Sequence, residues 1–151
     1  MEFIADLHTK IIHFPIALLF TYVLFDAVGI ISKKETYQKA AHILLLLGVL
    51  GAFAAAFSGN QAFASYKFWN DQSLEVFNNH EFYANLTVWY FTALLILRTY
   101  FVIKKKYIHQ LKYLLLILGF IGCALVFQTS EFGGKLVKIF GIGTELIQNQ
   151  Q

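Results

Sequence analysis

Four long apolar stretches alternate with short polar segments along the chain. They run from about residue 11 to 31, from 38 to 64, from 81 to 103 and from 108 to 129. A helix needs about 20 mostly apolar residues to cross the hydrocarbon core of a bilayer, and each stretch reaches that length. The stretches are much longer than β-strands and show no strict alternation of apolar and polar positions. The pattern therefore predicts an all-α membrane protein with four transmembrane helices.

Short polar connections join the first stretch to the second and the third to the fourth. Helices joined in this way pack as antiparallel neighbours, so we expect an up-down bundle of four helices in a single domain, residues 1–151. A longer loop, residues 66–79, separates the two pairs. Residues 131–151 mix glycines with apolar residues and are too short to span a bilayer. They predict a short interfacial segment after the last helix, on the outer face.

The lysines predict the orientation of the bundle. Three lysines lie in or beside the first short connection and four in or beside the second, whereas the 66–79 loop carries one lysine together with Asp71 and Glu75. Lys and Arg are enriched in cytoplasmic loops. We therefore expect the two short connections in the cytoplasm and both termini on the opposite side of a bacterial inner membrane.

Composition narrows the classes of function. The chain is 58% hydrophobic and 14% charged, against about 45–50% and about 25% in soluble domains, which favours a bilayer as its surroundings. The net charge of +3 is small and the lysines lie in short loops, so no nucleic-acid partner is expected. The single cysteine, Cys123, excludes a disulfide framework and a CxxC metal site. No motif of a stand-alone enzyme is present.

Two charged residues lie inside the apolar stretches. Asp26 and Arg98 each stand five residues before the end of their stretch, so the predicted topology places them at the same depth. An unpaired charge at membrane depth costs about 2.5–3.5 kcal/mol on insertion scales. We expect a structural ion pair that fixes the first helix against the third. The alternative is that each side chain extends separately to the interface.

Five histidines are the only plentiful ligand-type side chains, and they sort by depth. His8, His13 and His80 collect at the outer ends of the first and third helices, whereas His42 and His109 lie at the inner ends of the second and fourth. Imidazoles projecting from facing helices can hold a haem iron from both sides. The best pair is His13 with His80, with His8 tuning or shielding the site. His42 with His109 is a weaker second pair.

This pattern predicts a b-type haem protein that exchanges electrons with a redox protein or a quinone. Two alternatives remain open. His8, His13 and His80, near Glu131 or Asp6, have the chemistry of a zinc or copper site. Otherwise the histidines are interface residues of a non-redox accessory subunit, since their apolar body and polar tip suit the membrane boundary. Each reading is compatible with an oligomer.

Small and polar residues within the stretches predict how the helices pack. Glycines and alanines are frequent in the second and fourth stretches and let helices approach closely in lipid. The same residues would also leave space for a flat cofactor. We expect the polar residues of the last two stretches to form interhelical hydrogen bonds; they are Asn85, Thr87, Thr92 and Gln128.

Several motifs together resemble a known family. They are Leu7-His8, His13-Phe14-Pro15-Ile16-Ala17-Leu18-Leu19, Asp26, Gly59, His80, Arg98 and the tail Gly133-Gly134-x-Leu136-Val137 to Gly141-x-Gly143. The chain resembles the small bacterial membrane proteins of domain-of-unknown-function family 2231 over nearly its whole length. The resemblance implies four transmembrane helices and no established activity. Members fused to or encoded near Rieske-type or cytochrome-type domains imply redox chemistry.

Residue by residue, the family pattern includes His8, His13 and His80 but not His42 or His109. Two departures stand out. This chain has Thr9 where members often have proline, and Phe140 where members often have a histidine. The absence of that histidine argues more strongly against a metal site with several histidine ligands than against a haem held by two histidines.

Overall fold

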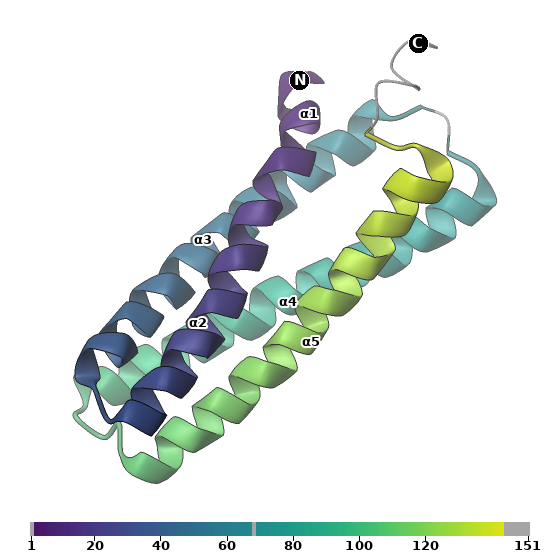
Figure 1. Cartoon of the computed structure of the whole chain (residues 1–151). Coiled ribbons are helices and arrows are strands. Elements are labelled where there is room, and N and C mark those ends of the chain that lie inside the picture. The colour runs from purple at the N-terminus through teal and green to yellow at the C-terminus, as the bar shows by residue number, and fades with distance from the viewer. Residues whose placement is uncertain (1, 68, 144–151) are drawn as a thin grey trace.

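The computed structural model describes the backbone of residues 2–67 and 69–143, and side chains within these ranges from Leu7 onward. The described residues form five helices and no strand: α1 (Glu2–Ile11), α2 (His13–Ser32), α3 (Glu35–Ser65), α4 (Asp71–Ile103) and α5 (His109–Phe140) (Figure 1). Helix α1 continues into α2, because Ile12 between them keeps helical dihedral angles. The predicted all-α fold is therefore confirmed, with α1 and α2 serving as one long helix.

The helices form an up-down bundle (Figure 1). Helix α2 packs against α3, α3 against α4, α4 against α5, and α5 against α2, whereas the diagonal pairs α2–α4 and α3–α5 have no close backbone contact within the described ranges. One end of the bundle carries α1, the connection 66–70 and the end of α5; we call it the histidine end. The other carries the turns 33–34 and 104–108; we call it the lysine end.

Two helices extend beyond the stretches that hydropathy marks. Helix α4 begins at Asp71, because Asn70 and Ser73 cap it reciprocally: Ser73 N–H donates to Asn70 Oδ1 (2.8 Å) and Asn70 N–H donates to Ser73 Oγ (3.0 Å). The predicted loop 66–79 is thus shortened to residues 66–70. A cap of this kind fixes the first residue of a helix, because it supplies acceptors to backbone N–H groups that have no partner within the helix. Its position does not depend on where the lipid begins.

Helix α5 also continues past residue 129. It ends at Phe140, followed by Gly141 in a left-handed conformation (φ 67°), whose N–H donates to the Val137 carbonyl (3.1 Å). The region expected to form a separate interfacial segment is therefore helical as far as Phe140. The remainder of that predicted segment, residues 144–151, lies outside the described residues.

Four helical segments are long and apolar enough to cross a membrane: Leu7–Ser32, Glu35–Ser65, Asp71–Ile103 and His109–Phe140. Large apolar side chains also cover the outside of the bundle. Phe14 is 70% exposed and Ile103 is 71% exposed, which suits a surface in contact with lipid tails and does not suit one in water.

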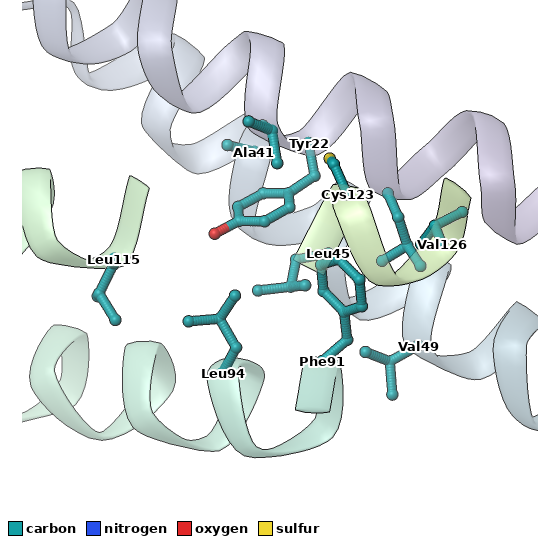
Figure 2. Close-up of a cluster of buried hydrophobic side chains, with 11 residues drawn as sticks. Tyr22, Ala41, Leu45, Val49, Phe91, Leu94, Leu115, Cys123 and Val126 are labelled. Carbon is teal, nitrogen blue, oxygen red and sulfur yellow. The ribbon is translucent and has the colours of Figure 1, made fainter. Parts of the chain in front are cut away.

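The core is a cluster of buried side chains from α2, α3, α4 and α5 (Figure 2). Two of the buried side chains pack directly against glycines. A Cβ atom on Gly122 of α5 would lie 2.4 Å from the ring of Phe91 on α4, and one on Gly48 of α3 would lie 2.6 Å from Leu19 on α2. In each hairpin, α2–α3 and α4–α5, a bulky side chain of one helix thus packs directly against a glycine of the other helix. Close packing by small residues is present as expected.

We predict that Gly122→Ala lowers the free energy of unfolding by about 1–3 kcal/mol, because the added methyl overpacks the contact with Phe91. Gly134→Ala in the same helix is the matched control. Nothing lies within 4 Å of its added Cβ, and alanine favours a helix by up to about 1 kcal/mol over glycine. Denaturant unfolding in detergent micelles measures both. Equal stability of the two variants would contradict the close α4–α5 contact.

Candidate functional site

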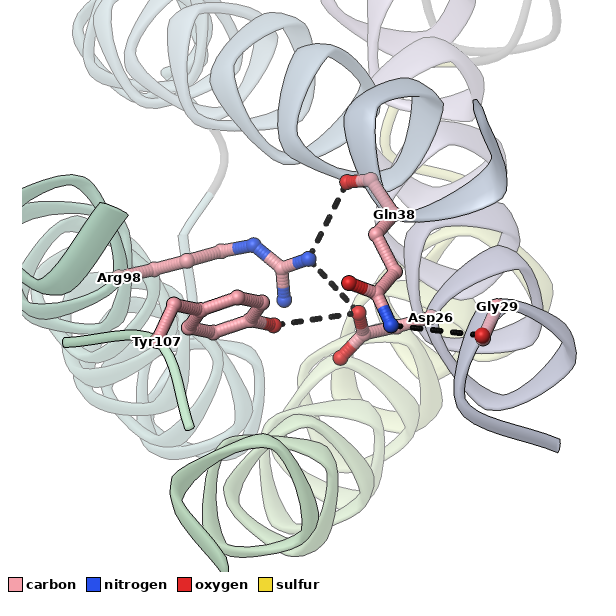
Figure 3. Close-up of polar contacts among 5 residues, drawn as sticks. All are labelled: Asp26, Gly29, Gln38, Arg98 and Tyr107. Atoms are coloured by element: carbon pink, nitrogen blue, oxygen red, sulfur yellow. Dashed lines mark hydrogen bonds and ion pairs between the residues drawn. The ribbon is translucent and has the colours of Figure 1, made fainter. Parts of the chain in front are cut away.

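The two charges within the spans meet near the lysine end of the bundle. Arg98 Nη2 lies 2.7 Å from Asp26 Oδ1, and the side chains are 1% and 0% exposed. These are the residues for which the sequence predicts an ion pair. The contact joins α2 to α4 across the diagonal of the bundle (Figure 3). Neither side chain extends to the membrane interface on its own.

Neighbouring helices complete the surroundings of this pair (Figure 3). Arg98 Nη2 also donates to the carbonyl of Gln38 on α3 (3.2 Å), and Gln38 Nε2 donates to the carbonyl of Gly29 (3.3 Å). The Tyr107 hydroxyl reaches Asp26 Oδ1 at 3.5 Å, the long limit of a hydrogen bond. Burial raises the pKa of Tyr107, so its phenol stays neutral and keeps its proton to donate.

Two aromatic rings enclose the guanidinium group. The Arg98 Cζ atom lies 5.6 Å from the ring centre of Tyr22 and 5.0 Å from that of Tyr107, within range of a cation–π contact. Four buried polar atoms around the pair have no hydrogen-bond partner among the described residues: Asp26 Oδ2, Arg98 Nε, Arg98 Nη1 and Tyr22 Oη. Burial of the pair therefore costs free energy, and loss of either residue would leave the other charge buried without a partner.

We predict that Arg98→Ala lowers the free energy of unfolding by about 3–5 kcal/mol, because it leaves the Asp26 carboxylate buried without a partner. The double change Asp26→Ala with Arg98→Ala removes both charges and should cost less than the sum of the two single changes. A double-mutant cycle in detergent measures the difference. Additive losses would show that the two residues are not coupled.

A second cluster, at the histidine end, consists of His8 and His80. His80 Nδ1 donates to the carbonyl of Thr129 on α5 (3.0 Å). His8 Nδ1 lies 2.9 Å from Ser58 Oγ on α3, whose hydroxyl already donates its proton to the Ala55 carbonyl (3.0 Å). With the Ser58 proton on the Ala55 carbonyl, His8 Nδ1 is the donor to Ser58. In that tautomer, as in His80, Nδ1 carries the ring proton and Nε2 has a lone pair for a ligand.

Each of these rings also lies against a glycine. A Cβ atom on Gly59 of α3 would lie 3.0 Å from His8 Cε1, and one on Gly133 of α5 would lie 3.1 Å from His80 Cε1. A larger residue at either position would press against the imidazole. Gly59, which the sequence pattern assigned to packing, and Gly133 of the tail motif thus also limit where two histidines stand, one from each hairpin.

His8, His13 and His80 line one cavity of about 1060 Å³, which we call the histidine cavity. All five helices contribute to its wall. Its volume lies just above the usual range for ligand sites, about 300–1,000 Å³. His13 differs from the other two histidines because its residue is exposed, whereas His8 and His80 are partly buried.

The other two histidines, His42 and His109, are not part of the wall of the histidine cavity. His42 is partly buried on α3 and His109 is exposed on α5, where its ring packs edge-on against Tyr113 (4.9 Å between ring centres). Helices α3 and α5 are a diagonal pair without backbone contact in the described ranges. The pairing of His42 with His109, the weaker pair that the sequence suggests, stays a prediction.

A preformed metal-ion site is also not found. Among the described side chains, those of residues 7–67 and 69–143, no three His, Cys, Asp or Glu are placed so that they could hold one ion. Glu131, considered as a ligand with the three histidines, lies 3.7 Å from Lys135 instead. The side chain of Asp6, the other acidic candidate, lies outside the described part of the chain.

Interhelical hydrogen bonds between polar span residues are present near His80. Thr87 Oγ1 of α4 and Thr129 Oγ1 of α5 lie 3.1 Å apart, so Thr87 has the role expected for it. Asn85 instead lines the histidine cavity. Sequence reasoning missed Ser58 and Thr129 as partners of the histidines, because each partner stands on a different helix from its histidine.

A repeat in the sequence could have revealed them. Asp26 and Arg98 are 72 positions apart, and His80 follows His8 by the same interval. The segment Leu47-Gly48-Val49-Leu50-Gly51-Ala52 returns as Leu118-Gly119-Phe120-Ile121-Gly122-Cys123. The two hairpins are thus similar in sequence. A hydroxyl residue of the second helix stands beside the histidine in each hairpin, Ser58 in one and Thr129 in the other.

Comparison with known proteins places the chain in a family. Neither a curated protein nor a solved structure matches it. A family model described as "Predicted membrane protein (DUF2231)" matches residues 5–146, a range that contains the ion pair and every residue of the histidine cavity. The chain therefore belongs to DUF2231, a family of predicted membrane proteins.

Proposed function

We propose that the histidine cavity binds a b-type haem and that the protein is a membrane-embedded electron-transfer subunit. The observation that carries this proposal is the state of two histidines, His8 and His80. They belong to different hairpins, line the same cavity, and each has its Nδ1 atom hydrogen-bonded to a neighbouring helix. Two imidazoles with free Nε2 atoms are the donor set of a bis-histidine haem iron.

The residues of the cavity suit this group. A histidine that ligates a metal almost always donates its other ring N–H to a carbonyl or a similar acceptor, which fixes the ring and raises its basicity. His80 does so to Thr129 and His8 does so to Ser58. The glycines beside both rings leave room for them to stand between helices. Most of the remaining wall is aliphatic or aromatic, as in other cofactor sites.

The choice of His8 as the partner of His80 differs from the pairing that the sequence favours, His13 with His80. His13 lines the same cavity but is exposed, whereas His8 has a hydrogen-bonded Nδ1. His13 therefore stays the second candidate for the iron ligand from the first hairpin. In the proposal, His80 is the ligand from the second hairpin and His8 is the ligand from the first.

When bound, a haem supplies one-electron chemistry. The chain itself would hold the ring between two hairpins, exclude water with the buried side chains of Leu19, Val88 and Val126, and orient both imidazoles through the hydrogen bonds of their Nδ1 atoms. The electron partner is a quinone in the bilayer or a redox protein at the histidine end. No separate catalytic group is required for electron transfer.

We expect purified protein, expressed in bacteria with ample haem, to show a Soret band and a sharp α-band on reduction. His80→Ala and His8→Ala should each reduce the haem-to-protein ratio to a small fraction of the unmodified protein's, because an iron held by two histidines loses one ligand. His109→Ala, at the lysine end, is the matched control and should keep full occupancy. His13→Ala tells which histidine of the first hairpin binds.

The absence of a Soret band in folded, unmodified protein would overturn the proposal. Histidine variants that only lose stability, with no change in cofactor, would favour the non-redox accessory subunit instead. Circular dichroism and gel filtration of each variant separate loss of haem from loss of fold.

We also propose that the lysine end faces the cytoplasm of a bacterial inner membrane. Lys33, Lys34 and the run from Lys104 to Lys106 support this orientation, since they lie in the two short turns of that end. A reporter enzyme that needs periplasmic disulfides, fused after Gln151, should then be active. Activity of the same reporter when it is inserted in the 104–106 turn, and not at the end of the chain, would reverse the orientation.

A further inference from the structure

We infer that the outer part of the histidine cavity contains a carboxylate-binding subsite formed by Lys67, Lys138 and Trp69. The inference rests on the proposed function, because the carboxylates it would take are the two propionates of a haem. Lys67 comes from the connection between α3 and α4, Trp69 from the same connection, and Lys138 from the last turn of α5. All three line the histidine cavity.

The two lysines are available for an anionic ligand. Lys135 and Lys39 each stand within 4 Å of a glutamate one turn away. Lys67 and Lys138, by contrast, have no ion pair with any described residue. Glu81 is the one acidic residue among the described lining residues. The lysines outnumber it, so the mouth of the cavity favours negative charge.

Trp69 adds a hydrogen-bond donor that lacks an acceptor. Its Nε1 atom is buried and has no partner among the described residues. Indole nitrogen can only donate, and buried donors are nearly always paired. A carboxylate oxygen is the acceptor that would satisfy it. A neutral ligand without acceptors at this edge, such as a hydrocarbon tail, would leave the donor unpaired.

The aromatic side chains beside Trp69 form a rigid wall. Phe63 and Phe77 stack with 4.2 Å between ring centres, and Trp69 lies 5.0 Å from Phe63 and 5.2 Å from Phe77. Tyr66 packs edge-on against Trp69 at 4.9 Å. All four residues line the histidine cavity. A flat ring system can pack against such a wall by aromatic contact.

The cavity is therefore polar at one end and apolar at the other. Leu19, Val88 and Val126 close it toward the middle of the bundle, and they are buried core residues. Lys67 and Lys138 belong to its opposite end, at the terminus of the bundle. This gradient fits a flat apolar molecule with carboxylates along one edge, and it sets the direction in which that molecule enters.

The test compares haem with its dimethyl ester, in which both carboxylates are blocked. Apo-protein in detergent is titrated with each, and the Soret band follows binding. The unmodified protein should bind haem at least about tenfold more tightly than the ester. The double change Lys67→Gln with Lys138→Gln should remove this preference, whereas Lys34→Gln with Lys106→Gln, at the lysine end, should keep it. Trp69→Phe keeps an aromatic ring but loses the donor. It should weaken haem binding several-fold and by more than it weakens ester binding, because an ester carbonyl is a weaker acceptor than a carboxylate.

The outcomes separate the two proposals. Equal binding of haem and ester by the unmodified protein, or an undiminished preference in the Lys67 and Lys138 variant, would overturn the subsite while the haem proposal stands. Failure of the unmodified protein to bind either compound would overturn the haem proposal, and the subsite would fall with it.

Discussion

A charge buried among apolar helices needs a partner, and this constraint determines how the two hairpins of the protein face each other. Asp26 and Arg98 stand on α2 and α4, the diagonal pair of helices whose backbones do not touch within the described ranges. The ion pair therefore sets both the relative depth and the relative rotation of the hairpins. Apolar packing alone is less selective, because one apolar side chain can slide past another at modest cost.

The position of the histidines follows from the same contact. Asp26 comes 18 residues after His8, and Arg98 comes 18 residues after His80. Eighteen residues are five turns of an α-helix, or about 27 Å. His8 is therefore on the same helical face as Asp26, because α1 and α2 form one continuous helix, and His80 is on the same face of α4 as Arg98. When the charges meet across the bundle axis, both histidines must face that axis five turns away.

The depth of the two charges and their pairing could be predicted from the sequence, whereas the helices that supply the partners of the histidines were not predicted. The spacing of Asp26 and Arg98 from the ends of their stretches was enough to place both at one level. The partners of His8 and His80 depend on which glycine and hydroxyl of another helix come beside them, and that depends on packing. The ends of α4 and α5 depend on a capping box and a left-handed glycine, which hydropathy does not register.

The two hairpins carry opposite charges at corresponding positions of the repeat, Asp26 in the first and Arg98 in the second. Two copies of the first hairpin facing each other would bring carboxylate against carboxylate, and two copies of the second would oppose two guanidinium groups. Like charges at that depth are strongly unfavourable. Charge complementarity therefore makes a first hairpin pair with a second hairpin and not with another first hairpin, and within one chain this pairing closes the bundle.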